Sequence, residues 1–162
     1  MLRATGGWIL LASLILTCPA HAQPAPRGAL EPDAVLADIN ARGARAVLSR
    51  ASTNEALFDG IETGHPKWLE VARQLRAVSD ASVALSLDYA VARALPHAPD
   101  QVLLLVGRGF TIDSVCTCPF VEPEPGVVED YARRAEAALR RVTAPGLTQL
   151  RDQCLARVHF RP

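Results

Sequence analysis

Apolar residues recur along this chain at the spacing of an amphipathic helix, and this periodicity restricts the fold more than any other feature. The clearest run covers residues 80–96. Its apolar side chains follow at three- and four-residue intervals, so one helix face would carry Val83, Leu87, Ala90, Val91, Ala94 and Leu95. Asp80 stands where an N-cap is expected, and Pro96 ends the pattern. Such a run predicts a helix with one buried face.

Proline and glycine divide the remaining chain into further helical segments. Prolines stand where a first helical turn tolerates them, and glycines stand where a helix would stop. The starts are at Pro32, Pro66, Pro99 and Pro145, and the ends at Gly64 and Gly107. Gly43 interrupts the first run and is expected to bend or split that helix. Residues 101–106, "QVLLLV", also suit a buried strand by residue type, but they lie between helix-type boundaries and are assigned to a helix.

The predicted fold is therefore all-α. We expect six or seven helices in antiparallel pairs joined by short loops, as a bundle or as a short helix-pair array, with one disulfide. Residues 31–162 are expected to form a single helical domain. A Pro-rich stretch at residues 23–30 is expected to be a flexible leader before that domain.

The first 22 residues have the parts of a secretory signal peptide. Arg3 supplies a positive start, residues 8–17 form an apolar core, and Ala20 and Ala22 form an A-x-A cleavage site. An apolar core of this length is too short to cross a bilayer as a helix. Cleavage would leave a chain that begins at Gln23, and we expect that chain to be exported, either to the periplasm or into the medium.

Two alternatives to a cleaved leader stay open. The leader could be retained as an anchor, or Cys18 could carry a lipid. Thr17 is a poor residue immediately before a lipidated cysteine, and the A-x-A site lies close by. No later apolar stretch reaches membrane length, so no stable membrane insertion is expected after cleavage.

The charge balance of the mature chain argues against some classes of partner. Removal of Arg3 with the leader leaves 16 basic and 17 acidic residues. A dedicated nucleic-acid binder or a protein of anionic membrane surfaces would show a basic excess. We therefore expect no nucleic acid among the partners.

Three cysteines remain after cleavage, and an oxidising compartment favours one disulfide and one spare thiol. Cys154 lies on the apolar stripe of the last predicted helix, which suits a structural bridge. Cys116 ends an apolar turn, whereas Cys118 precedes Pro119 and is pushed out of helical geometry. A bridge between Cys116 and Cys118 themselves would be strained. The sequence predicts a Cys116–Cys154 disulfide and a free thiol at Cys118, while a pairing of Cys118 with Cys154 stays open.

A metal or redox role is the alternative to a bridge for these thiols. A C-x-C motif with a nearby histidine can hold Cu(I), but His159 follows Cys154 by five residues and the mature chain has no Met. Zinc would need a second pair of ligands, and a thioredoxin-like role would need C-x-x-C. No metal site and no cofactor are predicted.

Other polar candidates have structural explanations. Glu122 and Glu124 lie between prolines and are expected to be solvated. His65 and His97 lie at helix junctions, where a histidine usually bonds a free backbone group. No catalytic residue is predicted. Trp68 is expected in the core, and if it is exposed it becomes the natural anchor of a partner interface.

Part of the chain resembles a tetratricopeptide repeat. Trp68, Ala84, Val91 and Pro96 match, at the right offsets, parts of that repeat, although Asp88 stands where its pattern has an aromatic residue. The match covers one unit, and stacked repeats need about three to be stable. It implies helix pairs of similar geometry.

A second resemblance covers most of the mature chain. The segments "IETGHPKWLEVARQLRAVSDAS", "ARALPHAPDQVLLLV", "CTCPFVE" and "LRDQCLARV" resemble a group of small, helical, exported proteobacterial proteins of unassigned function. This resemblance implies Cys116 as the bridged cysteine of the C-x-C pair, and it implies no activity.

The sequence thus predicts an exported helical protein that acts by binding a protein or peptide and catalyses no reaction. Two alternatives from other classes remain. One is a periplasmic thiol or copper carrier that uses Cys116 and Cys118, and the other is an enzyme whose site leaves no sequence motif.

Overall fold

The computed structural model describes residues 30–158. The predicted signal peptide, Cys18, the cleavage site before Gln23, nearly all of the predicted leader and His159 lie outside this range. Within it the chain forms nine α-helices and one 3₁₀ helix. They are α1 (Pro32–Arg42), α2 (Ala44–Ala51), α3 (Glu55–Glu62), α4 (Pro66–Arg76), α5 (Ala81–Ala94), α6 (Pro99–Leu103), α7 (Ile112–Val115), α8 (Val127–Leu139), η1 (Pro145–Leu147) and α9 (Thr148–Leu155).

The all-α prediction is confirmed, but the predicted number of helices is wrong. Two local features add helices to the expected six or seven. Gly43 adopts φ 84°, which an L side chain rarely adopts, and it splits the first run into α1 and α2. The short apolar turn before Cys116 is long enough to form α7.

The segment "QVLLLV" does not form a strand. Its first three residues belong to α6, which ends at Leu103. Val106 then forms an isolated bridge with Phe110, and the backbone N–H of Gly107 donates to the Phe110 carbonyl at 3.0 Å. Residues 30–158 contain no β-strand beyond this bridge.

Side-chain caps account for several of the helix starts. Asn54 accepts from the Ala56 N–H at 3.1 Å, His65 from the Lys67 N–H at 3.3 Å, and Asp80 from the Val83 N–H at 3.0 Å. Each contact satisfies a backbone donor that has no partner inside the helix. Two of these starts agree with the sequence, which predicts a helix start at Pro66, next to His65, and an N-cap at Asp80.

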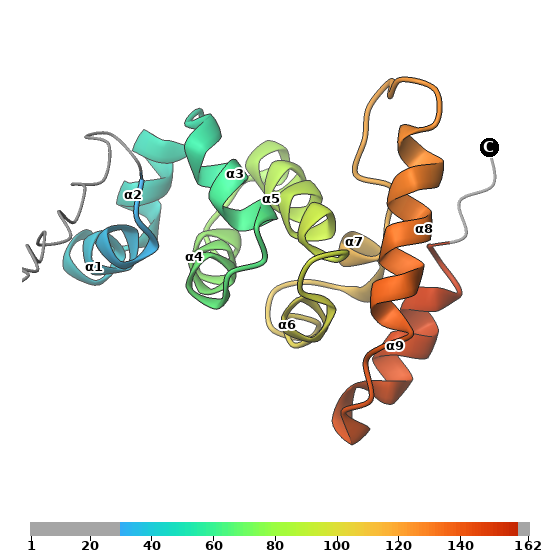
Figure 1. Cartoon of the computed structure of the whole chain (residues 1–162). Coiled ribbons are helices and arrows are strands. Elements are labelled where there is room, and N and C mark those ends of the chain that lie inside the picture. Colours follow the sequence, from blue (N-terminus) through green and yellow to red (C-terminus); the bar gives the residue numbers. More distant parts are fainter. Residues whose placement is uncertain (1–29, 159–162) are drawn as a thin grey trace, which may run out of the picture.

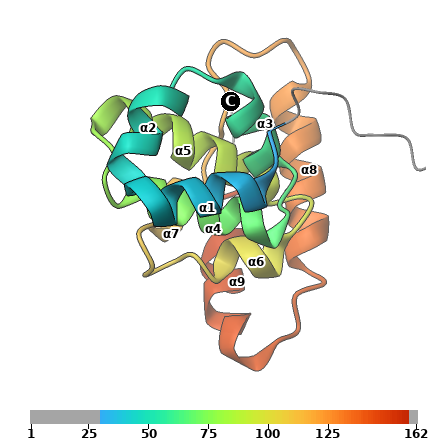
Figure 2. The ribbon, with the colours of Figure 1, turned by 90° about the vertical axis from the view of Figure 1, so that its left-hand side faces the viewer.

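The helices follow one another across the molecule in chain order (Figure 1), from α1 and α2 at one end to α8 and α9 at the other. In Figure 2, which views the α1–α2 end, α1 lies across α4, with which it is in contact. Helix α5 contacts α3, α4, α6 and α7, and therefore occupies the middle of the molecule. None of the described helices is both long and apolar enough to span a membrane.

One connected hydrophobic core runs through these helices. Its fully buried members include residues from seven of the helices, among them Leu57, Ile61, Leu75, Leu87, Leu103, Val115, Leu139 and Cys154. The helical periodicity of the sequence therefore corresponds to a continuous buried surface, which supplies the main driving force for folding.

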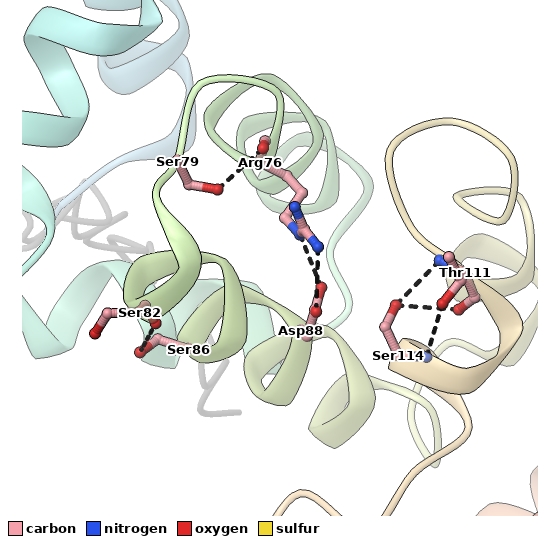
Figure 3. A network of polar contacts seen from close by, with 7 residues as sticks. All are labelled: Arg76, Ser79, Ser82, Ser86, Asp88, Thr111 and Ser114. Atoms are coloured by element: carbon pink, nitrogen blue, oxygen red, sulfur yellow. Dashed lines mark hydrogen bonds and ion pairs between the residues drawn. The ribbon is translucent and has the colours of Figure 1, made fainter.

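A polar contact between Arg76 and Asp88 connects α4 and α5 (Figure 3), and a cation–π contact connects Arg76 to the loop before α7. The Arg76 guanidinium donates to Asp88 at 2.9 Å and lies 5.9 Å from the centroid of the Phe110 ring. The Asp88 side chain is only 14% exposed. Asp88 stands where the tetratricopeptide pattern has an aromatic residue, and here it has an electrostatic partner instead.

Candidate functional site

The structure contains the predicted disulfide between Cys116 and Cys154. The two sulfur atoms are 2.01 Å apart and the Cα atoms 5.3 Å apart. Both residues are buried, and the bridge links the C-terminal end of α7 to α9. Cys118 is a free, half-buried thiol in the loop that follows.

The loop after the bridge is held by Arg93 of α5. Its guanidinium donates to the Pro119 carbonyl at 2.8 Å and to Glu62 at 2.8 Å. It also lies 5.6 Å from the centroid of the Phe120 ring. These contacts combine a charged hydrogen bond, an ion pair and a cation–π contact, and they fix the loop against α5.

Tyr131 of α8 attaches the same loop to the core. Its ring meets Phe120 edge to face, with centroids 5.4 Å apart, and its hydroxyl donates to the Ala92 carbonyl at 2.8 Å. Burial raises the pKa of this hydroxyl far above its ordinary value, and nearby Cys118 adds to the shift. Cys118 therefore lies near the Tyr131 hydroxyl. Among the described residues, no group of three or more His, Cys, Asp or Glu side chains could hold a metal ion.

Trp68 forms part of the wall of an open groove of about 620 Å³, between the start of α1 and the α3–α4 and α5–α6 turns. Only 7% of Trp68 is exposed, because its ring lies against Gly60. His65 and His97 line the groove and are exposed. His65 caps α4, as expected for a junction histidine. Trp68 is therefore mainly a core residue, and its role in binding stays a prediction.

A second groove, of about 320 Å³, lies between α3 and α5. Helix α3 contributes residues spaced three and four apart, which places them on one face of the helix, and α5 contributes a matching row. The lining residues are Glu55, Phe58 and Asp59 from α3, and Ser86, Tyr89 and Arg93 from α5.

The α3–α5 groove combines apolar walls with exposed carboxylates. Phe58 and Tyr89 are half-buried, and Leu85, one turn before Tyr89 on α5, is 51% exposed. Glu55 and Asp59 are exposed and have no ion-pair partner among residues 30–158. The surface can therefore bind an apolar group beside a cation.

The sequence did not identify Leu85, Tyr89 or Phe58 as candidate site residues. A detectable signal was present, because Leu85 and Tyr89 are one helical turn apart and lie off the apolar face that Leu87 and Val91 define. Large apolar side chains on a predicted solvent face mark a candidate interface. Phe58 gave no such signal, since only the packing of α3 on α5 shows how far it is exposed.

The carboxylates between prolines are placed as expected. Glu122 and Glu124 are both exposed in the loop between α7 and α8. Neither lines the grooves described above.

No protein-family model, curated protein or solved structure matches the chain. The candidate site therefore rests on the geometry of this chain alone.

Proposed function

We propose that the protein is exported and acts by binding a protein or peptide partner in the α3–α5 groove, without catalysing a reaction. The observation that carries the proposal is an open groove between two helices that Phe58 and Tyr89 line, with exposed Leu85 one turn before Tyr89 on α5. Large aromatic residues are frequent anchors of protein interfaces. A groove between neighbouring helices is also a recurrent site for an amphipathic partner segment.

Export is supported by the leader in the sequence and by the bridge. Disulfides persist in oxidising compartments and are rare where thiols are kept reduced. The proposal keeps the predicted arrangement of helices in antiparallel pairs, and it keeps the predicted site of action in the periplasm or outside the cell. The alternative of a thiol or copper carrier would first require reduction of the bridge, since Cys116 is bonded to Cys154.

Site-specific photocross-linking in the exporting cell tests this proposal. A photoreactive residue replaces Ser86 in the groove, or exposed Gln149 on α9 as the control. Position 86 is expected to give a discrete cross-linked product that position 149 does not give. A third position, His97, tests the predicted alternative at the Trp68 groove. Products from position 97 and none from position 86 would move the binding site to Trp68, and no product from either would contradict the proposed function.

A further inference from the structure

We infer that the partner segment at the α3–α5 groove is a basic amphipathic helix, with two Arg or Lys side chains one turn apart beside an apolar stripe. This inference rests on the proposed function, because it specifies the partner of the same groove. Three features lead to it: the charges at the rim, the spacing of the carboxylates and the acceptors that line the groove.

The rim of the groove has an excess of negative charge. Glu55 and Asp59 are exposed and lack an ion pair in the part of the chain that the structure describes. Arg93 also lines the groove, but it is bonded to Glu62 and to the Pro119 carbonyl, so its charge is already offset. Two negative charges thus remain for a partner to neutralise.

The spacing of these carboxylates selects the partner geometry. Glu55 and Asp59 are four residues apart on α3, so they stand about 6 Å apart along the helix axis. Two basic residues four apart on a partner helix have the same spacing. Phe58 lies between the carboxylates in sequence, and Phe58 of α3 and Tyr89 of α5 both line the groove, which gives it apolar surface for the stripe of the partner.

The α5 side of the groove offers a hydrogen-bond acceptor at Ser86. The Ser86 hydroxyl donates to the Ser82 carbonyl at 3.3 Å, so its lone pairs remain to accept a hydrogen bond. Asp88 does not contribute, because its carboxylate points toward Arg76 and away from Ser86 (Figure 3). The Tyr89 ring adds a face on which a cation can rest.

Anionic partners fit this surface poorly. Phosphates of nucleic acids or of lipid headgroups would be repelled by Glu55 and Asp59. An anion that lost its hydration in the groove would also find no unpaired cation to compensate for that loss. A small polyamine would satisfy the charges but would leave the apolar strip exposed to water. A protein segment that carries both cations and apolar side chains pairs with the two carboxylates and also covers the apolar strip.

Three synthetic helical peptides with the same Leu and Ala stripe provide the test. The two positions beside the stripe carry Arg, Gln or Glu, and binding to the exported chain is measured by fluorescence anisotropy. The Arg peptide is expected to bind most tightly and to weaken as salt is added. Glu55→Gln combined with Asp59→Asn is expected to weaken its binding about five- to tenfold, as the loss of two exposed ion pairs implies.

The matched control is Glu122→Gln combined with Glu124→Gln, which removes the same charge from an exposed loop outside the groove. This variant is expected to bind the Arg peptide like the wild type. Tyr89→Ala removes the aromatic wall and should weaken all three peptides, and its melting curve shows whether the fold is retained. Equal loss in the control variant would mean that overall charge, and not the groove, sets the affinity.

The outcomes separate this inference from the proposed function. If the Gln or Glu peptide binds as tightly as the Arg peptide and Tyr89→Ala weakens it, the basic partner is refuted and the groove still binds peptides. If no peptide binds but position 86 cross-links in cells, the basic partner is again refuted, while the groove still binds a partner. If no peptide binds and position 86 gives no product, both proposals fail.

Two further occupants are tested in the same titration. Spermine displacing the Arg peptide at equal concentration would refute a protein segment in favour of a small polycation. Sedimentation of the protein alone is expected to show a monomer. A dimer that Tyr89→Ala dissociates would instead assign the groove to a second copy of this chain.

Discussion

Helix α4 packs close to α3 because Gly60 of α3 has no side chain. A Cβ atom placed on Gly60 would lie 2.5 Å from one atom of the Trp68 ring and 2.8 Å from two others. The ring is fixed, because Trp68 is 7% exposed in the core. The position of Trp68, and the shape of the groove beside it, therefore depends on the absence of a side chain at residue 60.

Gly60→Ala is expected to lower the free energy of unfolding by up to about 2 kcal/mol. Overpacking a core costs about 1–3 kcal/mol, and the better helix propensity of Ala returns about 1 kcal/mol. Chemical denaturation measures the change. In a chain that begins at Gln23, Trp68 is the single tryptophan, so its fluorescence reports the displaced ring directly.

Gly146→Ala is the control for this substitution. A Cβ at Gly146 would meet no heavy atom within 4 Å, so the variant should be neutral or more stable by up to about 1 kcal/mol. Equal stability of the Gly60→Ala variant and the wild type would show that Trp68 is free to move away from α3.

At the scale of elements, the short helix α7 depends on its cap. The Thr111 hydroxyl accepts from the Ser114 N–H at 3.1 Å, and the Ser114 hydroxyl accepts from the Thr111 N–H at 3.1 Å (Figure 3). This capping box satisfies two backbone donors at once. Four residues form a marginal helix by themselves, so the box and the bridge at Cys116 together hold the turn.

Thr111→Ala is expected to destabilise the protein by about 1 kcal/mol, the usual cost of losing an N-cap. Hydrogen exchange of the Val115 and Cys116 amides should become faster, because they donate to the Thr111 and Ile112 carbonyls of α7. Thr143→Ala, at an exposed position between α8 and η1, should change stability by less than about 0.5 kcal/mol. Unchanged exchange in the Thr111→Ala variant would mean that the bridge alone maintains α7.

Much of the element order was accessible from the sequence, because the signals were local. Asn54 and Asp80 are capping residues, and Gly64, with φ 74°, ends α3 as its position implied. The length of α6 could not be predicted from the sequence. The run to Gly107 reads as one apolar segment, but α6 ends at Leu103 and Val106 forms a bridge with Phe110.

The candidate site was less accessible than the fold. Trp68 was identified by residue type, and the structure buries it against a glycine on another helix. Which face of α3 and of α5 remains open depends on how these helices pack on the rest of the core. The disulfide could be predicted from the sequence, because the helical stripe that carries Cys154 and the Pro119 next to Cys118 are both local features.

At the scale of the whole molecule, the bridge is the covalent link between distant parts of the core. Cys116 and Cys154 are separated by 38 residues and enclose α8 and η1. The chain-entropy model assigns a bridge of this span about 4 kcal/mol of stability. That is a large share of the roughly 5–15 kcal/mol typical of a folded domain.

Cys116→Ser and Cys154→Ser are each expected to lower the free energy of unfolding by about 2–4 kcal/mol. Cys118→Ser should change it by less than about 0.5 kcal/mol, because this thiol is free. The double variant Cys116→Ser, Cys118→Ser prevents Cys118 from taking over the pairing. Peptide mapping without reduction gives the direct answer, and a linked 118–154 peptide in the wild type would refute the assigned bridge.

The α3–α5 groove is the proposed binding surface of an exported protein. Amide NMR of the chain that begins at Gln23, titrated with the Arg peptide, locates the bound peptide on the surface. Shift changes are expected to concentrate at Phe58, Asp59, Ser86 and Tyr89, with the His65 and His97 amides unchanged. Shifts concentrated at His65, Trp68 and His97, or spread evenly over the exposed acidic residues, would contradict the proposal.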